Sequence, residues 1–180
     1  RLHARERDDQ GTGRASGNPP AWRNLFQPAP ILFGAYMAKV SLAPVSPRLA
    51  ALTGQPVDLS HTPDGLRDAV MAYFAQHGAE WALRVQLCTS LEKMPIEDSS
   101  VAWPEEESQW ITVATLRAGR QPGWSTALSE AIDDGMHFNP WHALAAHRPL
   151  GSIMRVRRAA YAMSRQFRAE RNGVPMDEPI

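Results

Sequence analysis

The chain has 180 residues, of which 43% are hydrophobic and 21% charged, a composition that suits one globular domain and excludes wholesale disorder. Its 19 basic and 19 acidic side chains balance, so no net charge draws the chain toward nucleic acid or an anionic membrane. The apolar runs are shorter than the ~20 residues that span a bilayer. The single cysteine, Cys88, cannot form an internal disulfide, so nothing demands an oxidising compartment and we expect a cytoplasmic location.

The first half of the chain predicts one strand and one helix. Residues 1–30 carry dense charge and then Gly, Ser, Asn and Pro, which favours a flexible N-terminal arm or a connecting segment. Residues 36–42 alternate in polarity, the period of a half-buried strand, and residues 49–58 indicate a loop with one short turn. The segment Thr62-Pro63-Asp64 predicts a helix start with Thr62 as the N-cap, and Gly78 predicts its end.

Two further strands are expected in the second half. Residues 81–88 alternate in polarity and predict the second strand, and residues 94–103 indicate a loop. Residues 110–116 are β-branched and apolar on both faces, which favours a strand in the centre of the sheet.

Helices close the chain. A helical stretch is expected from Pro122 to Ile132, followed by a loop over residues 137–151 and a last helix from about Ile153 to Arg171. Because no βαβ rhythm is sustained, this order predicts an α+β fold with an antiparallel sheet. Three strands cannot close a barrel, so either more strands lie in the ambiguous segments or the sheet is incomplete.

The last predicted helix places one phenol and two guanidiniums on one side. At about 100° per residue, with Arg157 at zero, Tyr161 falls at roughly 40° and Arg168 at roughly 20°. Ser164 shares this face, and an adjoining apolar stripe consists of Val156, Ala160, Met163 and Phe167. A positive charge one helical turn away favours the phenolate form of tyrosine. Tyrosinate is one of the axial ligands of haem iron, so this face is a candidate metal-ligating site.

Other interpretations of the same helix stay open on spacing alone. It could be an ordinary amphipathic helix with an arginine-rich exposed face. It could also bind anions or nucleic acid, because residues 155–171 hold six arginines and one glutamate. Elsewhere, the spacing of five between His137, His142 and His147 fits no zinc pattern and favours structural histidines. The pair Glu97-Asp98 could serve acid–base chemistry, although a turn or loop-capping role is favoured.

Several separated motifs, in a consistent order from about Pro30 to Asn172, resemble the catalase-related haem proteins of bacteria. The motifs that carry this resemblance are Met94-Pro95-Ile96-Glu97-Asp98, Trp103-Pro104-Glu105, Phe138-Asn139-Pro140-Trp141-His142, His147-Arg148-Pro149-Leu150-Gly151-Ser152-Ile153, and the closing Arg157-x-x-x-Tyr161 with Phe167-Arg168-Ala169-Glu170-Arg171-Asn172.

The resemblance implies haem b bound against a partial antiparallel β-barrel of the catalase-like fold, with flanking helices and a C-terminal helix that ligates the iron. Tyr161 would be the axial ligand, and Arg157 would stabilise its phenolate. Arg168 would lie toward the haem propionates, and Phe138 would pack on the proximal side of the macrocycle. Residues 31–175 would then be the C-terminal portion of a catalase-like haem-binding domain, and residues 176–180 a tail.

The motifs that carry the distal catalytic residues of catalases have no counterpart in this sequence. In catalases a distal histidine and asparagine come from the N-terminal half of the fold, ahead of the resembling region, and His3, Asn18 and Asn24 lack the corresponding motifs. We therefore identify no catalytic residue. Two hypotheses follow: a portion of a haem oxidoreductase that acts on hydrogen peroxide or organic hydroperoxides, or a degenerate, non-catalytic haem-binding remnant. The expected partners are the peroxide and either a second copy of the chain or an N-terminal half, without nucleic acid.

Overall fold

The computed structural model describes residues 16–17, 20–59, 62–173, 175 and 177. Its centre is a five-stranded antiparallel sheet in the order β2–β4–β6–β7, with β3 also paired to β4. The strands of this sheet are β2 (Leu25–Phe26), β3 (Ile31–Phe33), β4 (Tyr36–Pro44), β6 (Ala79–Leu87) and β7 (Ile111–Ala118). A separate two-stranded ribbon pairs β1 (Ser16–Gly17) with β5 (Val57–Asp58). Over the described residues the sheet is not closed, so the predicted α+β class with an incomplete antiparallel sheet is confirmed.

Strands β4 and β6 form the middle of the sheet and confirm the strands predicted at 36–42 and 81–88. Their register runs from Ala38 opposite Leu87 to Pro44 opposite Trp81. Polar side chains are buried here as well as apolar ones, because Lys39 and Gln86 face each other across the pair and both are buried. The simple apolar-in, polar-out alternation therefore does not hold at this point.

The prediction of a central strand at 110–116 is wrong in its position. Within the part of the chain that the structure describes, strand β7 pairs with β6 alone and lies at the edge of the sheet. Seven of its eight residues are exposed, including Ile111, Val113 and Leu116 at 51%, 41% and 53%. Apolar residues on both faces of a strand indicate that other elements should bury both faces. In β7 the described part of the chain does not bury them.

A hydrophobic cluster joins one end of the sheet to the helices of the first half, α1 (Pro47–Ala50), α2 (Gly65–Gln76) and the 3-10 turn η1 (Pro20–Trp22). The cluster consists of Trp22, Leu49, Tyr73, Phe74, Ala79 and Trp81. Residues 20–30 of the predicted N-terminal arm thus contribute Trp22 and β2 to the fold, whereas residues 1–15 and 18–19 lie outside the described residues.

Helix α2 begins later than predicted. Its N-cap is Asp64 and not Thr62, because the backbone N–H of Gly65 bonds the Thr62 carbonyl in a turn that precedes the helix. Asp64 instead forms an ion pair with Arg67, one turn into the helix, at 2.7 Å. The helix ends at Gln76 with His77 as C-cap, just before the predicted stop at Gly78.

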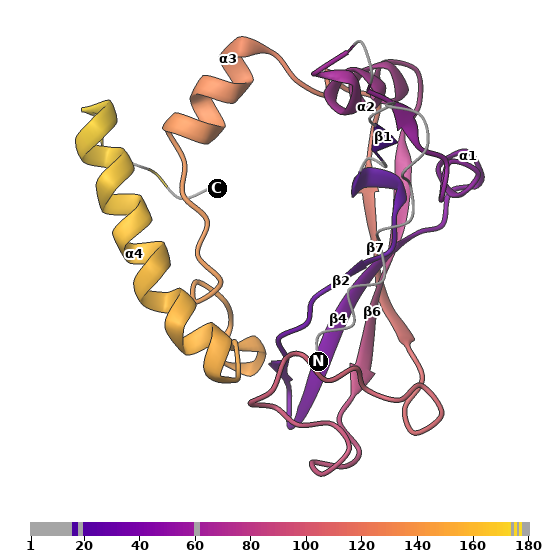
Figure 1. The fold of residues 1–180 in the computed structure, drawn as a ribbon, viewed down its shortest axis with the longest axis vertical. Coiled ribbons are helices and arrows are strands. Elements are labelled where there is room, and N and C mark those ends of the chain that lie inside the picture. The colour runs from indigo at the N-terminus through magenta and orange to yellow at the C-terminus, as the bar shows by residue number, and fades with distance from the viewer. Residues whose placement is uncertain (1–15, 18–19, 60–61, 174, 176, 178–180) are drawn as a thin grey trace.

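The second half of the chain forms an arm of helices that lies apart from the sheet in Figure 1. It consists of α3 (Thr126–Ser129), the π-helical turn η2 (Glu130–Asp134), the 3-10 turn η3 (Ala145–His147) and α4 (Ser152–Asn172). The arm is tied to the sheet domain at both ends: Gln121 N donates to Phe74 O at 3.0 Å, and Leu32 N donates to Arg148 O at 2.9 Å. The helix predicted from Pro122 begins only at Thr126, since Ser125 is its N-cap.

None of the helices in the described ranges is both long and apolar enough to cross a membrane.

Candidate functional site

Helix α4 carries the candidate site and matches its predicted bounds within a residue at each end. It is rich in Ala, Arg and Met, which are strong helix formers, and Gly173 ends it in the left-handed conformation. Met154 is its one buried residue among those described. The apolar stripe predicted from the helical wheel is solvent-exposed, with Val156, Met163 and Phe167 at 72%, 71% and 62%. An apolar surface thus lies open beside the face of Tyr161.

The N-terminal end of α4 is held by the loop that contains the first resembling motif. Arg155 donates from Nη1 and Nη2 to the two carboxylate oxygens of Glu97, at 3.1 and 2.7 Å, and the Ser152 hydroxyl donates to the Glu97 carbonyl at 2.7 Å. Gly151 precedes the helix at φ +87° and lies so close that a Cβ there would be 2.5 Å from the Ile96 carbonyl oxygen. Two motifs that are about fifty residues apart in the sequence therefore meet at the start of α4.

Arg157 and Tyr161 are in direct contact, as their spacing of one helical turn predicts. The Arg157 Nη2 donates to the Tyr161 hydroxyl oxygen at 2.7 Å, and the guanidinium carbon lies 5.3 Å from the centroid of the ring. Both side chains are half-buried. Because a guanidinium can only donate hydrogen bonds, the tyrosine oxygen is an acceptor in this pair, and a positive charge lies beside it.

Tyr161 lies in the wall of a cavity together with two of the other predicted residues. The cavity has a volume of about 380 Å³ and is lined by His137, Phe138, Ala160, Tyr161, Ser164 and Arg168. A second cavity of about 420 Å³ also includes Tyr161, Phe138 and His137 and extends along Arg165 and Ala169. The structure thus brings Tyr161, Phe138 and Arg168 to one hollow, with Arg157 hydrogen-bonded to the first of them.

Arg168 is oriented by the π-helical turn η2. Its Nη1 donates to the Asp133 carbonyl at 2.7 Å, and one turn later Asn172 Nδ2 approaches the Asp134 carbonyl at 3.4 Å. The Arg168 Nε is buried and has no hydrogen-bond partner among the described residues. Sequence reasoning missed this support, because a backbone carbonyl exposed by a π-turn leaves no signal in the side chains.

The arginine-rich face of α4 is largely occupied by contacts within the protein. The Arg158 guanidinium lies over the Trp141 ring, 4.9 Å from its centroid. Three further arginines donate hydrogen bonds within the protein: Arg155 to Glu97, Arg157 to Tyr161 and Arg168 to the Asp133 carbonyl. Four of the six arginines between residues 155 and 171 are therefore engaged. This arrangement does not favour the interpretation of the helix as a nucleic-acid surface.

The predicted histidines and acids fall into structural roles. His137 is buried, with Nδ1 3.2 Å from the Asp177 carbonyl, and its ring meets that of His142 edge-on at 5.8 Å. His147 stacks on Phe33. Across the described ranges, no group of three or more His, Cys, Asp or Glu could hold a metal ion.

Structural roles also account for the other candidate residues, Asp98, Glu97 and Cys88. Asp98 accepts from the Ser100 backbone N–H at 3.0 Å and from its hydroxyl at 2.6 Å, which is the loop-capping role favoured from the sequence. Glu97 binds Arg155 and does not pair with Asp98 for acid–base chemistry. Burial raises the pKa of the Cys88 thiol, which opposes a nucleophilic role.

The contact between Glu97 and Arg155 predicts a pH dependence of stability. The hydrogen bond from the Arg155 guanidinium to the Glu97 carboxylate holds the pKa of Glu97 below the ordinary value of 4.5. A carboxyl with a lowered pKa in the folded state stabilises the protein above its unfolded pKa, and this contribution is lost as the pH falls through the folded pKa. We expect Glu97→Gln to unfold at a lower temperature than the wild type at pH 7, with a gap that shrinks as the pH falls below 4.5.

Thermal unfolding followed by circular dichroism between pH 7 and pH 3 measures this gap. Glu92→Gln removes an exposed glutamate from the same loop region and is the control. A gap for Glu97→Gln that does not change with pH would contradict the role of this carboxylate.

The sequence and the structure were compared with known proteins. No protein-family model matches the sequence, and the search of curated proteins found no match. A crystal structure of a fungal catalase matches 81% of this chain at a TM-score of 0.61 and 16% sequence identity. The fold is catalase-like. The chain spans about 30% of the length of that fungal catalase, so the incomplete sheet and the arm of helices correspond to part of a catalase fold.

Proposed function

We propose that the chain is a haem b-binding, catalase-like protein in which the phenolate of Tyr161 is the axial ligand of the iron. The observation that carries this proposal is the 2.7 Å hydrogen bond from Arg157 to the tyrosine oxygen, in the wall of a cavity shared with Phe138 and Arg168. The substrate would be hydrogen peroxide or an organic hydroperoxide, in keeping with the catalase-like fold. Residues 31–175 would form the haem-binding portion.

The residues around the cavity suit a porphyrin. Phe138 is exposed and offers an aromatic face. Outside the cavity lining, the exposed Val156, Met163 and Phe167 offer apolar surface along the adjoining stripe of α4. The Arg168 Nε is a buried donor without a partner among the residues that the structure describes, and the charge of this guanidinium would complement a carboxylate such as a haem propionate. When bound, haem would supply a redox-active iron.

Each side chain then has a defined task in the proposed site. Arg157 places a positive charge and an N–H donor 2.7 Å from the tyrosine oxygen, which would offset negative charge on an oxygen that is bound to iron. The carbonyl of Asp133 orients Arg168, because it receives one of the guanidinium donors at 2.7 Å. Phe138 lines the same cavity as Tyr161 and would offer its aromatic ring to the macrocycle.

Titration with haemin tests the proposal. We expect the wild type to bind haemin with the high-spin, five-coordinate spectrum of a tyrosinate ligand. We expect Tyr161→Phe to lose this spectrum and to bind about tenfold or more weakly, because the phenol oxygen is the one atom removed.

Tyr36→Phe is the matched control, because Tyr36 is an exposed tyrosine on β4 and lies outside the candidate cavities. This variant should keep the spectrum of the wild type. An unchanged spectrum in Tyr161→Phe would show that Tyr161 is not the ligand.

The alternative is a haem-binding protein without turnover. It is the second hypothesis from the sequence, in which His3, Asn18 and Asn24 do not match the distal motifs of catalases. Peroxide consumption by the haemin-loaded protein distinguishes the two functions, since only the enzyme would consume peroxide faster than the Tyr161→Phe variant.

A further inference from the structure

A third cavity lies on the sheet, apart from α4. It has a volume of about 270 Å³ and lies between β2, β4 and β6 and the loop of residues 99–103. Three aromatic rings line it, from Phe26, Trp103 and Trp110, and the first and last of these are in contact at 5.6 Å between centroids. The remaining wall includes Lys39 and Gln86. Flat aromatic walls of this kind suit a planar ligand.

Lys39 is a buried amine in this cavity, with 6% of its surface exposed. Its Nζ donates to the Val101 carbonyl at 2.7 Å and lies 5.0 Å from the centroid of the Trp103 ring. Within the described part of the chain, no carboxylate lies at ion-pair distance from this nitrogen. The acid that influences it most, Asp98, is exposed and already accepts two hydrogen bonds from Ser100.

The polar groups around Lys39 hold the wall of the cavity in place. Gln86 is buried and holds the loop in place, since its amide donates to the carbonyls of Trp103 and Ser108 at 3.2 and 2.9 Å. Trp103 is also buried, yet its indole N–H has no hydrogen-bond partner among the described residues. A buried donor without a partner is costly to a fold, so this wall of the cavity carries one unsatisfied N–H among the described residues.

We propose that this cavity binds a small planar aromatic aldehyde and that the Lys39 Nζ forms an imine with its carbonyl carbon. The amine lone pair attacks that carbon to give a carbinolamine. The C–O bond then breaks, and the oxygen leaves as water with two protons that came from the amine. The products are one imine and one water, and no oxidant or reductant takes part.

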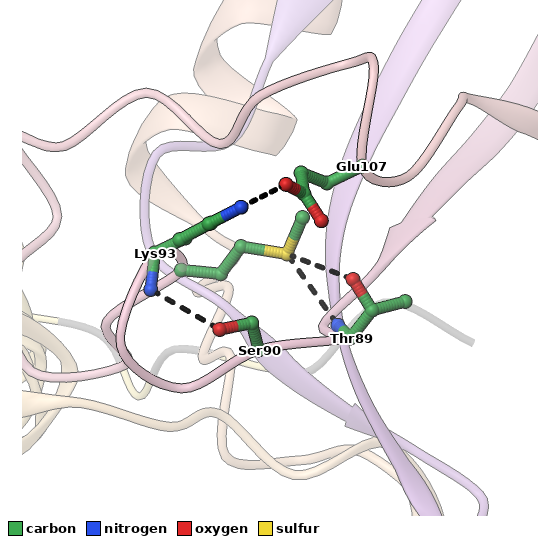
Figure 2. A network of polar contacts seen from close by, with 5 residues as sticks. Thr89, Ser90, Lys93 and Glu107 are labelled. Carbon is green, nitrogen blue, oxygen red and sulfur yellow. Dashed lines mark hydrogen bonds and ion pairs between the residues drawn. The ribbon is translucent and has the colours of Figure 1, made fainter.

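The two lysines of the chain differ in the way that this chemistry requires. Desolvation lowers the pKa of Lys39, against a smaller opposing effect of the Asp98 charge, and so favours the neutral, nucleophilic amine. Lys93 is exposed, and its hydrogen bond to Glu107, drawn in Figure 2, raises its pKa and favours the ammonium form. The chain therefore contains its own internal control.

Reductive trapping tests the proposal. The wild-type protein is incubated with pyridoxal near pH 7.5, and the imines are reduced with cyanoborohydride and located by peptide mass spectrometry. We expect the adduct on Lys39 to exceed that on Lys93 by about tenfold. Acetaldehyde, which has no ring to contact the aromatic walls, should show a clearly smaller preference for Lys39.

The possible outcomes decide the proposal without a destabilised variant. Equal labelling of the two lysines, or more labelling of Lys93, would overturn it. An equal preference for both aldehydes would also overturn it, because the aromatic walls would then play no part. Lys93→Arg should leave the pyridoxal adduct on Lys39 unchanged. The experiment uses no haem, so its result is independent of the function proposed for Tyr161.

Discussion

Gly151→Ala is expected to lower the free energy of unfolding by about 3 kcal/mol, because two unfavourable effects combine at this position. The backbone there has φ +87° and ψ 166°, a region that is essentially restricted to glycine. In addition, the new Cβ would lie 2.5 Å from the Ile96 carbonyl oxygen, a contact that side chains do not make. Either the loop of residues 94–98 or the start of α4 would have to move. Urea unfolding followed by circular dichroism measures the loss.

Gly173→Ala separates the two effects. Gly173 also has a positive φ, of +68°, but among the described residues no atom outside its own helix and chain neighbours lies within 4 Å of its ideal Cβ position. This substitution should cost only the backbone strain, about 1 kcal/mol. If Gly151→Ala were no worse than Gly173→Ala, the close approach of the motif at Ile96 to α4 would be wrong.

Met154→Ala is expected to cost about 2–5 kcal/mol, the usual range for a fully buried methionine that is cut back to alanine. Met154 is 1% exposed and is the one buried side chain of α4 among the described residues. Its sulfur lies 3.7 Å from Arg157 Nη1, so the cavity would open next to the candidate ligand pair. Haemin binding should weaken along with stability.

Met163→Ala is the matched control on the same helix. Met163 is 71% exposed, so its truncation should change the free energy of unfolding by no more than about 0.5 kcal/mol. Equal losses in the two variants would mean that α4 is not anchored to the rest of the protein through Met154.

Much of the secondary structure could be predicted from local patterns. The alternation over residues 36–42 and 81–88 predicted β4 and β6, because a period of two directly reflects a pleated strand. The start of α2 was predicted too early, since Thr62-Pro63-Asp64 has the composition of a helix cap but belongs to the preceding turn. Composition identifies the kind of element here more securely than its first residue.

In the candidate site, too, local contacts could be predicted from the sequence and long-range contacts could not. The contact of Arg157 with Tyr161 follows from the sequence, because residues four apart on a helix are neighbours whatever surrounds them. Phe138 beside Tyr161, and Asp133 beneath Arg168, depend on how the arm folds back on itself, and no spacing rule encodes that path. The family resemblance supplied Phe138, and nothing in the sequence indicated the Asp133 carbonyl.

By itself the sequence determined the last helix, its Arg-x-x-x-Tyr face and the antiparallel α+β class, since each rests on contacts between near neighbours or on a short period. The tertiary structure alone decided that β7 is an edge strand, that Glu97 clamps Arg155 at the start of α4, and that Lys39 is buried among aromatic rings. These features join residues that are tens of positions apart. Their physical cause is the packing of whole elements, which places chemically ordinary side chains in water-poor surroundings where their charges and donors matter.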